Sequence, residues 1–110
     1  MARIVAIAPD LLFGSKIEAM LTAAGHEVTL SPSLAKAQPS GADLIVADLD
    51  SEDSQALADL GTPVLGYYSH VNAETKRAAD AAGIDVTVPR SRLARELVTL
   101  AAGLLDAGAS

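Results

Sequence analysis

The sequence predicts an α/β fold in which a five-stranded parallel sheet lies between two layers of helices. Three observations carry this prediction. Short apolar runs alternate with helix-like patterns five times, the connections between them are short, and residues 44–47 are apolar throughout. Such alternation is typical of parallel strands that are joined by helices and buried on both faces.

The first half of the chain contains three of the expected strands. Apolar runs predict these strands at residues 3–8, 27–30 and 43–47. In residues 12–24 the apolar side chains recur at steps of three and four, which predicts a helix that Gly25 ends. Residues 33–37 allow only a brief helix, because Pro39 and Gly41 follow and interrupt it.

The second half contains the other two strands, which are expected at residues 64–68 and 85–88. Asp50 or Ser51 is expected to cap the third helix, because either side-chain oxygen can accept a hydrogen bond from the free backbone N–H groups. Asn72 is expected to cap a helix that runs to residue 82. A last helix opens at residues 89–91, and its apolar face consists of Leu93, Leu97, Leu100, Ala101 and Leu104.

Right-handed crossovers between five parallel strands predict a flavodoxin-like three-layer sandwich with strand order 2-1-3-4-5. The topological switch then lies between strands one and three, where open α/β folds bind their ligands. Asp10 follows the first strand and Asp48 ends the third, so we expect both carboxylates at this crevice. Two carboxylates are hard oxygen ligands that suit Mg²⁺ as a cofactor. The alternative is that each carboxylate only caps the helix that follows it.

The composition is that of one globular domain, and it excludes several classes of function. The chain has 110 residues, of which 50% are hydrophobic, and a formal net charge of −6. Because cysteine is absent, disulfides, thiol catalysis and cysteine metal sites are excluded. The acidic balance argues against nucleic acid as a partner. No signal peptide or membrane span is visible, so we expect a cytoplasmic protein without a membrane partner.

Aromatic residues are scarce, so the core is expected to be aliphatic and rich in alanine. Strand alternation sends Tyr67 and Tyr68 to opposite faces of the sheet. The hydroxyl that is exposed is expected to meet water or a polar partner.

The whole pattern resembles a response-regulator receiver domain of the CheY-like family, in a divergent form. Residues 43–49 resemble the third strand of that family, residues 62–65 the start of its fourth strand, and residues 82–85 the exit of the helix that follows. The resemblance spans nearly all of the chain and implies one receiver-like domain over residues 1–110. It also implies a phosphoprotein in two-component signalling, with Asp48 as the counterpart of the phosphoacceptor.

The sequence departs from the family pattern around Asp48. The two adjacent acids that usually follow the first strand are reduced to Asp10. The Ser or Thr of the family falls near Ser69, and the lysine after the fifth strand is absent, with Arg90 nearby. Ser69 and Arg90 are therefore the candidate phosphate contacts, although Arg does not replace Lys freely. Asp50 adds a negative charge where a phosphate would lie.

Divergent receivers of this kind often act without phosphorylation, as docking or dimerising modules. The resemblance therefore implies signal transduction through contact with a kinase or output protein, or through self-association, with phosphorylation of Asp48 weak or lost. The family's partner surface implies a basic face on the helix of residues 72–82, the fifth strand and the last helix. Its members here are Lys76, Arg77, Arg90, Arg92 and Arg95.

Two alternatives to this function stay open. One is a phosphorylatable, Mg²⁺-dependent receiver that uses Asp10, Asp48 and Ser69. The other is a domain that binds a small molecule in the crevice near Asp10, Ser69 and His70. An enzyme is not expected, because no set of acid, base and nucleophile converges in the sequence, and no catalytic residue is predicted.

Overall fold

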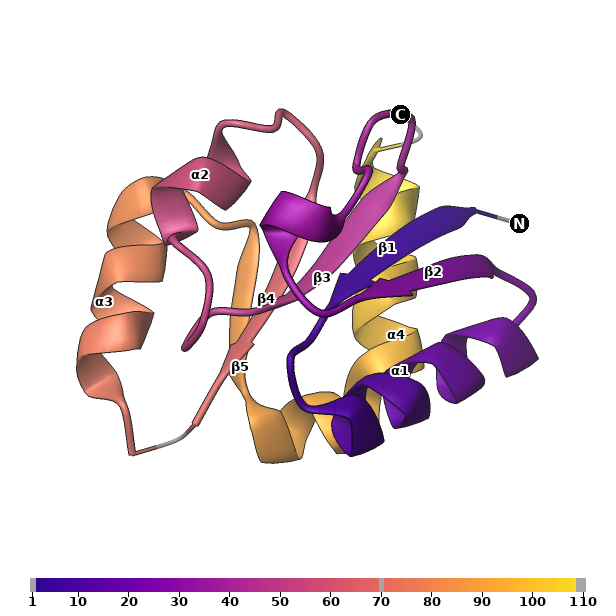
Figure 1. Cartoon of the computed structure of the whole chain (residues 1–110), viewed down its shortest axis with the longest axis horizontal. Coiled ribbons are helices and arrows are strands. Elements are labelled where there is room, and N and C mark those ends of the chain that lie inside the picture. The colour runs from indigo at the N-terminus through magenta and orange to yellow at the C-terminus, as the bar shows by residue number, and fades with distance from the viewer. Residues whose placement is uncertain (1, 70, 109–110) are drawn as a thin grey trace.

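The structure is a computed structural model that describes residues 2–69 and 71–108 (Figure 1). Its strands are β1 (Arg3–Ile7), β2 (Glu27–Ser31), β3 (Leu44–Asp48), β4 (Val64–Tyr68) and β5 (Val86–Pro89). Its helices are α1 (Leu11–Ala23), α2 (Ser54–Ala58), α3 (Ala73–Ala82) and α4 (Arg90–Gly108), with a 3-10 helix at Leu34–Lys36. The strands pair in parallel in the order β2-β1-β3-β4-β5, which confirms the predicted flavodoxin-like sandwich.

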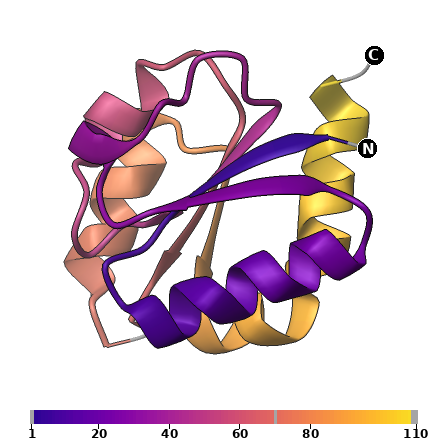
Figure 2. The same cartoon turned by 45° about the vertical axis from the view of Figure 1, so that its right-hand side comes forward.

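The helices cover the two faces of the sheet in pairs. α1 and α4 lie on one face, and α2 and α3 lie on the other (Figures 1 and 2). The first pair contributes to the core Phe13, Ile17, Leu21, Leu93, Leu97 and Ala101. The second pair contributes Leu57 and Ala79. All five residues of β3 are buried, as expected for a central parallel strand that is covered on both faces.

Tyr67 and Tyr68 point to opposite faces of the sheet, as strand alternation predicts. Tyr67 packs in the cluster below α1 and α4, and Tyr68 packs in the cluster below α2 and α3. Both are buried, with 2% and 7% of their surface exposed. Both rings are buried because β4 is covered by helices on both faces, and the predicted contact of one tyrosine hydroxyl with water or a polar partner stays a prediction. The Tyr67 hydroxyl has no hydrogen-bond partner among the residues that the structure describes.

Gly66 in β4 creates the space that Leu49 occupies directly after Asp48. A Cβ atom on Gly66 would lie 2.5 Å from Leu49 Cδ1, which is closer than carbon atoms can approach. Leu49 is only 4% exposed and packs in the cluster below α2 and α3. Because Gly66 has no side chain, Leu49 can pack against β4, and this packing helps to fix the backbone where β3 ends.

Two helix starts differ from the prediction. The N-cap of α2 is Asp53, whose side chain accepts a hydrogen bond from Ala56 N at 3.1 Å, and neither Asp50 nor Ser51 caps this helix. Asn72 lies at the N-cap position of α3 but makes no capping hydrogen bond with its side chain. Asp50 instead accepts a hydrogen bond from the Asn72 amide nitrogen at 3.0 Å, so the side chains of these two expected caps contact each other.

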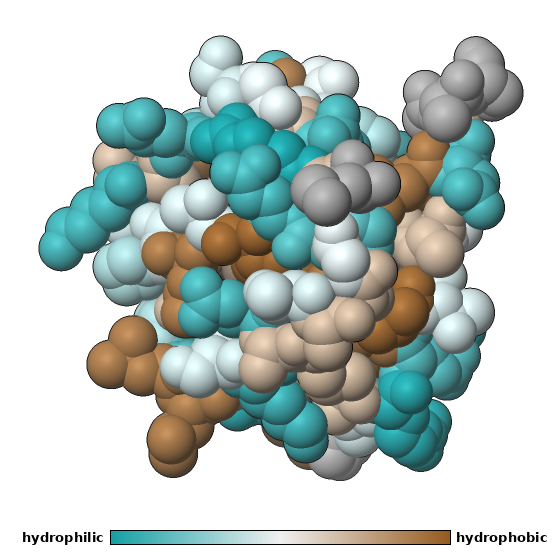
Figure 3. Space-filling model, turned by 90° about the vertical axis from the view of Figure 1, so that its right-hand side faces the viewer, coloured by the Kyte–Doolittle hydropathy of each residue, from teal (hydrophilic) through white to brown (hydrophobic). Residues whose placement is uncertain are grey.

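The face of the molecule in Figure 3 is a mixture of hydrophilic and hydrophobic residues. On the face drawn in Figure 3, hydrophobic residues form several separate groups between hydrophilic ones. The most exposed large hydrophobic side chains of the described residues are Leu11, Leu12 and Val71, which lie on or beside the loops after β1 and β4. Within residues 2–69 and 71–108, no helix is long and apolar enough to cross a membrane.

Candidate functional site

Asp10 lies where β1 gives way to α1, at the edge of the sheet where the strands end. Its Oδ1 atom caps α1 by accepting hydrogen bonds from Leu12 N at 3.0 Å and Phe13 N at 3.2 Å. Its Oδ2 atom accepts a hydrogen bond from the Arg90 guanidinium at 2.6 Å. These hydrogen bonds, the one from Arg90 above all, hold the pKa of the Asp10 carboxyl below its ordinary value.

Arg90 connects the start of α4 to the start of α1 across this edge. It is the first residue of α4, directly after β5, and its side chain reaches back to Asp10 at the start of α1. Its guanidinium also lies 4.0 Å from the centre of the Phe13 ring, which is a cation–π contact. Phe13 in turn packs against Tyr67, with 5.2 Å between the ring centres. Arg90 is therefore held by both a carboxylate and an aromatic face.

Asp48 lies at the last position of β3 and is 9% exposed. Its Oδ1 atom accepts a hydrogen bond from Asp50 N at 2.8 Å, so the carboxylate closes the turn after β3 rather than capping a helix. Burial raises the pKa of the Asp48 carboxyl above its ordinary value, and the Asp50 charge adds to this. The hydrogen bond from Asp50 N and, to a lesser degree, the nearby Arg90 charge oppose the rise in that pKa but do not cancel it.

Asp50 ties the loop after β3 to the loop after β4. Its two carboxylate oxygens accept hydrogen bonds from Ser69 N at 2.8 Å and from Asn72 Nδ2 at 3.0 Å. Ser69 is thus attached to the site through its backbone. Its predicted role as a phosphate contact stays a prediction. His70 was predicted to lie in the same crevice, but it falls outside the residues that the structure describes.

A cavity of about 400 Å³ opens between these groups, at the edge where β3 and β4 end. It is lined by Phe13, Asp48, Asp50, Tyr67, Ser69, Arg90, Ser91 and Ala94. Its size lies within the range of small-ligand sites. The structure thus brings Asp48, Ser69 and Arg90 together, as predicted from the sequence, and Arg90 joins Asp10 to the group.

The carboxylate oxygens at this edge are nearly all engaged by internal donors. Asp10, Asp48 and Asp50 supply six oxygens, and five of them accept hydrogen bonds from the chain itself. Among the described residues, only Asp48 Oδ2 has no such donor, and no three acidic, His or Cys side chains are grouped to hold a metal ion. As arranged, these residues do not fit Mg²⁺, which requires near-octahedral oxygen ligands. The Mg²⁺ role of Asp10 and Asp48 stays a prediction that requires Arg90 to leave Asp10.

The predicted partner face lies around β5, which is an edge strand of the sheet flanked by α3 and α4. Each of its five basic side chains pairs with an acidic one. The pairs are Lys76–Asp80, Arg77–Glu74, Arg90–Asp10, Arg92–Glu96 and Arg95–Glu96. The face therefore presents mixed charge rather than a uniformly basic patch, and its role in partner binding stays a prediction.

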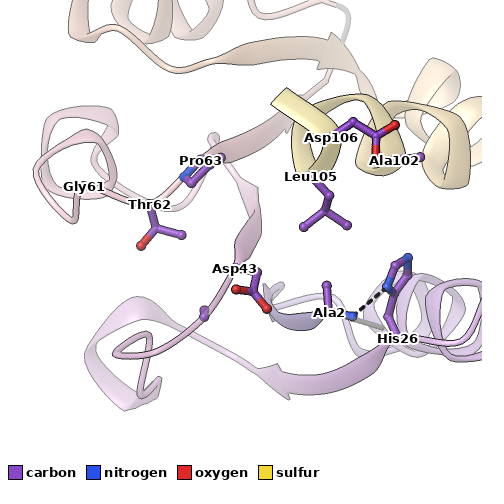
Figure 4. Close-up of a pocket in the computed structure, with 10 residues that line it drawn as sticks. Ala2, His26, Asp43, Gly61, Thr62, Pro63, Ala102, Leu105 and Asp106 are labelled. Atoms are coloured by element: carbon purple, nitrogen blue, oxygen red, sulfur yellow. Dashed lines mark hydrogen bonds between the residues drawn. The ribbon is translucent and has the colours of Figure 1, made fainter. Parts of the chain in front are cut away.

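A larger cavity, of about 580 Å³, lies at the opposite edge of the sheet, where the strands begin (Figure 4). It lies between the starts of β1 and β4 and the end of α4, which contributes Ala102, Leu105 and Asp106. Two of its polar side chains are already engaged. His26 Nδ1 accepts a hydrogen bond from Ala2 N at 3.3 Å, and Asp43 Oδ2 accepts one from Arg3 N at 2.8 Å. Since open α/β folds bind ligands at the other edge, we place the functional site at Asp48.

Comparison with known proteins supports the fold. No family model matches the sequence, and no curated protein matches it. The structure is similar to a CheY-like response regulator receiver domain protein from Methanospirillum hungatei JF-1, with a TM-score of 0.84 and 19% identity over 98% of this chain and 96% of that one. A response regulator receiver protein from Burkholderia phymatum has a TM-score of 0.78 and 18% identity, with 96% of each chain covered.

A third similar structure is NtrX from Brucella abortus, with a TM-score of 0.81 and 21% identity. The match covers 97% of this chain but 27% of NtrX, so the same fold also occurs as one part of a longer protein. At these identities the likeness establishes the fold. The chain therefore has the fold of CheY-like receiver domains, as the sequence predicted.

Some residues of the site were not predicted from the sequence. Phe13 belongs to the apolar series that predicts the first helix, Tyr67 was expected on one face of the sheet, and the structure shows that both line the cavity. The spacing of the helix at residues 12–24 identifies Phe13 as buried, but it does not show that the ring lies below a guanidinium. Ser91 and Ala94 line the cavity because they lie with Arg90 in the first turns of α4, which form one of its walls.

Proposed function

We propose that this chain is a cytoplasmic signalling module with the receiver fold, which acts through contact with a protein partner or a second copy. In this proposal, phosphorylation of Asp48 is weak or lost, and the domain is not an enzyme. The observation that carries the proposal is the ion pair at 2.6 Å between Arg90 and Asp10. It commits the basic residue nearest to Asp48 to an internal partner.

The surroundings of Asp48 support weak phosphorylation. An incoming phosphoryl donor is an anion, and it would meet the carboxylates of Asp48, Asp50 and Asp10 at one edge. Only one nearby cation, Arg90, faces these three groups among the described residues, and Asp10 already holds it. Stabilising the transferred phosphoryl group therefore requires a change in this ion pair.

The proposal is tested by adding acetyl phosphate and Mg²⁺ to the purified chain and measuring its intact mass. We expect little or no added phosphoryl group. We also expect the sedimentation behaviour over a range of protein concentrations to be the same with and without the phosphate donor. Rapid and complete phosphorylation that disappears in Asp48→Asn and changes sedimentation would contradict the proposal.

That result would support a second candidate function, a phosphorylatable receiver. The observation in its favour is that Asp48 Oδ2 has no hydrogen-bond donor among the described residues and that Ser69 and Arg90 line the same cavity. In this reaction Asp48 Oδ2 attacks the phosphorus of acetyl phosphate, the bond to the acetyl oxygen breaks, and acetate leaves. Mg²⁺ would supply charge neutralisation only if Arg90 left Asp10, because the residues as arranged do not fit this ion.

The cavity itself favours a third candidate, the binding of a small molecule. Its volume of about 400 Å³ and the buried, unpartnered Tyr67 hydroxyl are features of a ligand site. A thermal-shift screen with nucleotides and metabolites tests this candidate. A saturable rise in melting temperature that is lost in Tyr67→Phe would support it.

A further inference from the structure

We propose that Arg90 is the resident cation of the carboxylate crevice and stands in place of a divalent metal ion. The crevice would then keep its structure without Mg²⁺ and would have little affinity for it. This inference deepens the proposed function, and it rests on that function only in taking the crevice at Asp48 as the signalling site.

The first argument is that both partners of the ion pair are already fixed in place. An ion pair whose side chains are 43% and 41% exposed is weak when it must order two mobile side chains. Here Asp10 is fixed by two backbone donors of α1, and Arg90 is fixed by the Phe13 ring. Little side-chain entropy remains to be lost, so the contact between Arg90 and Asp10 persists.

The second argument is that Arg90 faces the whole acidic group and not only Asp10. The Asp48 carboxyl and the buried Tyr67 hydroxyl both experience the positive charge of Arg90. The same Tyr67 hydroxyl also experiences the charges of Asp10, Asp48 and Asp50. Arg90 contacts Asp10 and lines the same cavity as Asp48 and Asp50, so its positive charge lies at the crevice that these carboxylates share.

The third argument concerns what a metal ion would have to displace. Of the six oxygens of Asp10, Asp48 and Asp50, five accept internal hydrogen bonds. Mg²⁺ gives up its water reluctantly and requires oxygen ligands in near-octahedral geometry. To bind Asp10 and Asp48 together, it would have to release Arg90 from Asp10 and leave the guanidinium facing a second positive charge. Competition between the two cations is the direct consequence.

The test is a titration of the ¹⁵N-labelled chain with Mg²⁺, followed by amide NMR. For the wild type we expect no saturable shifts at residues 10–13 and 48–50 up to roughly 10 mM Mg²⁺. For Arg90→Ala we expect saturable shifts at the same residues, with binding at least about tenfold tighter than in the wild type. Adding Asp48→Asn to Arg90→Ala should remove this gained binding.

Arg92→Ala is the matched control. Arg92 lies on the same helix, and its removal changes the net charge equally, but it pairs with Glu96 and does not line the cavity. A general electrostatic gain in Mg²⁺ affinity would appear equally in both variants. Equal gains would therefore overturn the inference, and so would saturable binding of Mg²⁺ to the wild type at Asp10 and Asp48.

If Arg90→Ala does not fold, measurements on the wild-type protein still test the inference. The guanidinium NMR signals of Arg90 should show restricted rotation and should not change when Mg²⁺ is added. Their release by Mg²⁺ would contradict the inference. All of these results are independent of phosphorylation, so failure of this inference is distinguishable from failure of the proposed function, which rests on mass and sedimentation measurements.

Discussion

Replacing Asp48 with Asn should make the protein more stable. Asp48 is 9% exposed, and burial raises the pKa of its carboxyl above the ordinary value of 3.8. A raised carboxyl pKa means that the folded protein tolerates the charge less well than the unfolded chain does. Asn keeps the Oδ1 acceptor for Asp50 N and removes both the buried charge and its repulsion with Asp50.

The size of the gain follows from the same contacts. The rise in the pKa of Asp48 shows that burial and the Asp50 charge outweigh the hydrogen bond from Asp50 N and the attraction to Arg90. Removing a partly buried charge of this kind is expected to stabilise the protein by about 1 kcal/mol near neutral pH. For a domain of this size that corresponds to a rise of about 4 °C in melting temperature. The new amide group faces the cavity, so water can satisfy its hydrogen bonds.

The pH dependence gives a sharper test than one measurement. Because the folded-state pKa of Asp48 is raised, its stability contribution is fully present below 3.8 and is lost as the pH rises through the folded-state pKa. Urea unfolding should therefore give similar stabilities for wild type and Asp48→Asn at low pH. The difference in free energy of unfolding between the two proteins should increase as the pH rises from 3.8 through the folded-state pKa of Asp48, and it should then stay constant to neutral pH.

Asp43→Asn is the control for this experiment. Asp43 lies just before the same strand and also accepts one backbone hydrogen bond, from Arg3 N at 2.8 Å, but it is exposed. Its replacement should not stabilise the protein. The reasoning about Asp48 is refuted if Asp48→Asn is destabilising near neutral pH, or if its effect does not depend on pH.

Three further substitutions test other parts of the site. Gly66→Ala should destabilise the protein by about 1–3 kcal/mol, because the new Cβ atom overlaps Leu49; urea unfolding measures this, and Leu49→Ala should reduce the added loss. Asp10→Asn keeps the helix cap but removes the charge that pairs with Arg90, so it should lower the melting temperature near neutral pH. The pKa of Asp10 is lowered in the folded protein, so the stabilisation by its charge is lost as the pH falls through that pKa. Well below pH 3.8 the variant and the wild type should therefore have the same melting temperature. Tyr67→Phe should change the unfolding free energy by less than about 1 kcal/mol, because its buried hydroxyl has no partner among the described residues; a larger loss would indicate that the hydroxyl is engaged.

Local patterns in the sequence were sufficient for the fold and for the position of Asp48. The apolar run before Asp48 predicts a buried strand, and a carboxylate at the end of such a strand lies at the edge where ligands bind. The caps of α2 and α3 could not be obtained in this way. Asp50, Ser51 and Asp53 are all acceptable caps, and local patterns do not show that Asp53 caps α2 while Asp50 contacts Asn72, which is 22 residues away.

The contact between Arg90 and Asp10 could not be predicted from local sequence patterns either, because it also joins distant parts of the chain. The two residues are separated by 80 positions in the chain, and they meet only because α1 and α4 lie on the same face of the sheet. The sequence marked Arg90 as a departure from the lysine of receiver domains. It did not show that the side chain turns toward Asp10 and Phe13.

The position of Arg90 is itself evidence for a role beyond helix formation. Arg90 begins α4, where the helix dipole is positive and where acidic side chains are preferred. An arginine there is locally unfavourable, and α4 would form at least as well with a neutral residue. Its position is explained by Asp10 and Phe13, which contact the guanidinium with a carboxylate and an aromatic face, and by the cavity that Arg90 lines together with Asp48. Arg90 is electrostatically unfavourable at the start of its own helix but favourable beside its distant neighbours, so we assign it to the site. The Mg²⁺ titration of Arg90→Ala measures its effect on cation binding there.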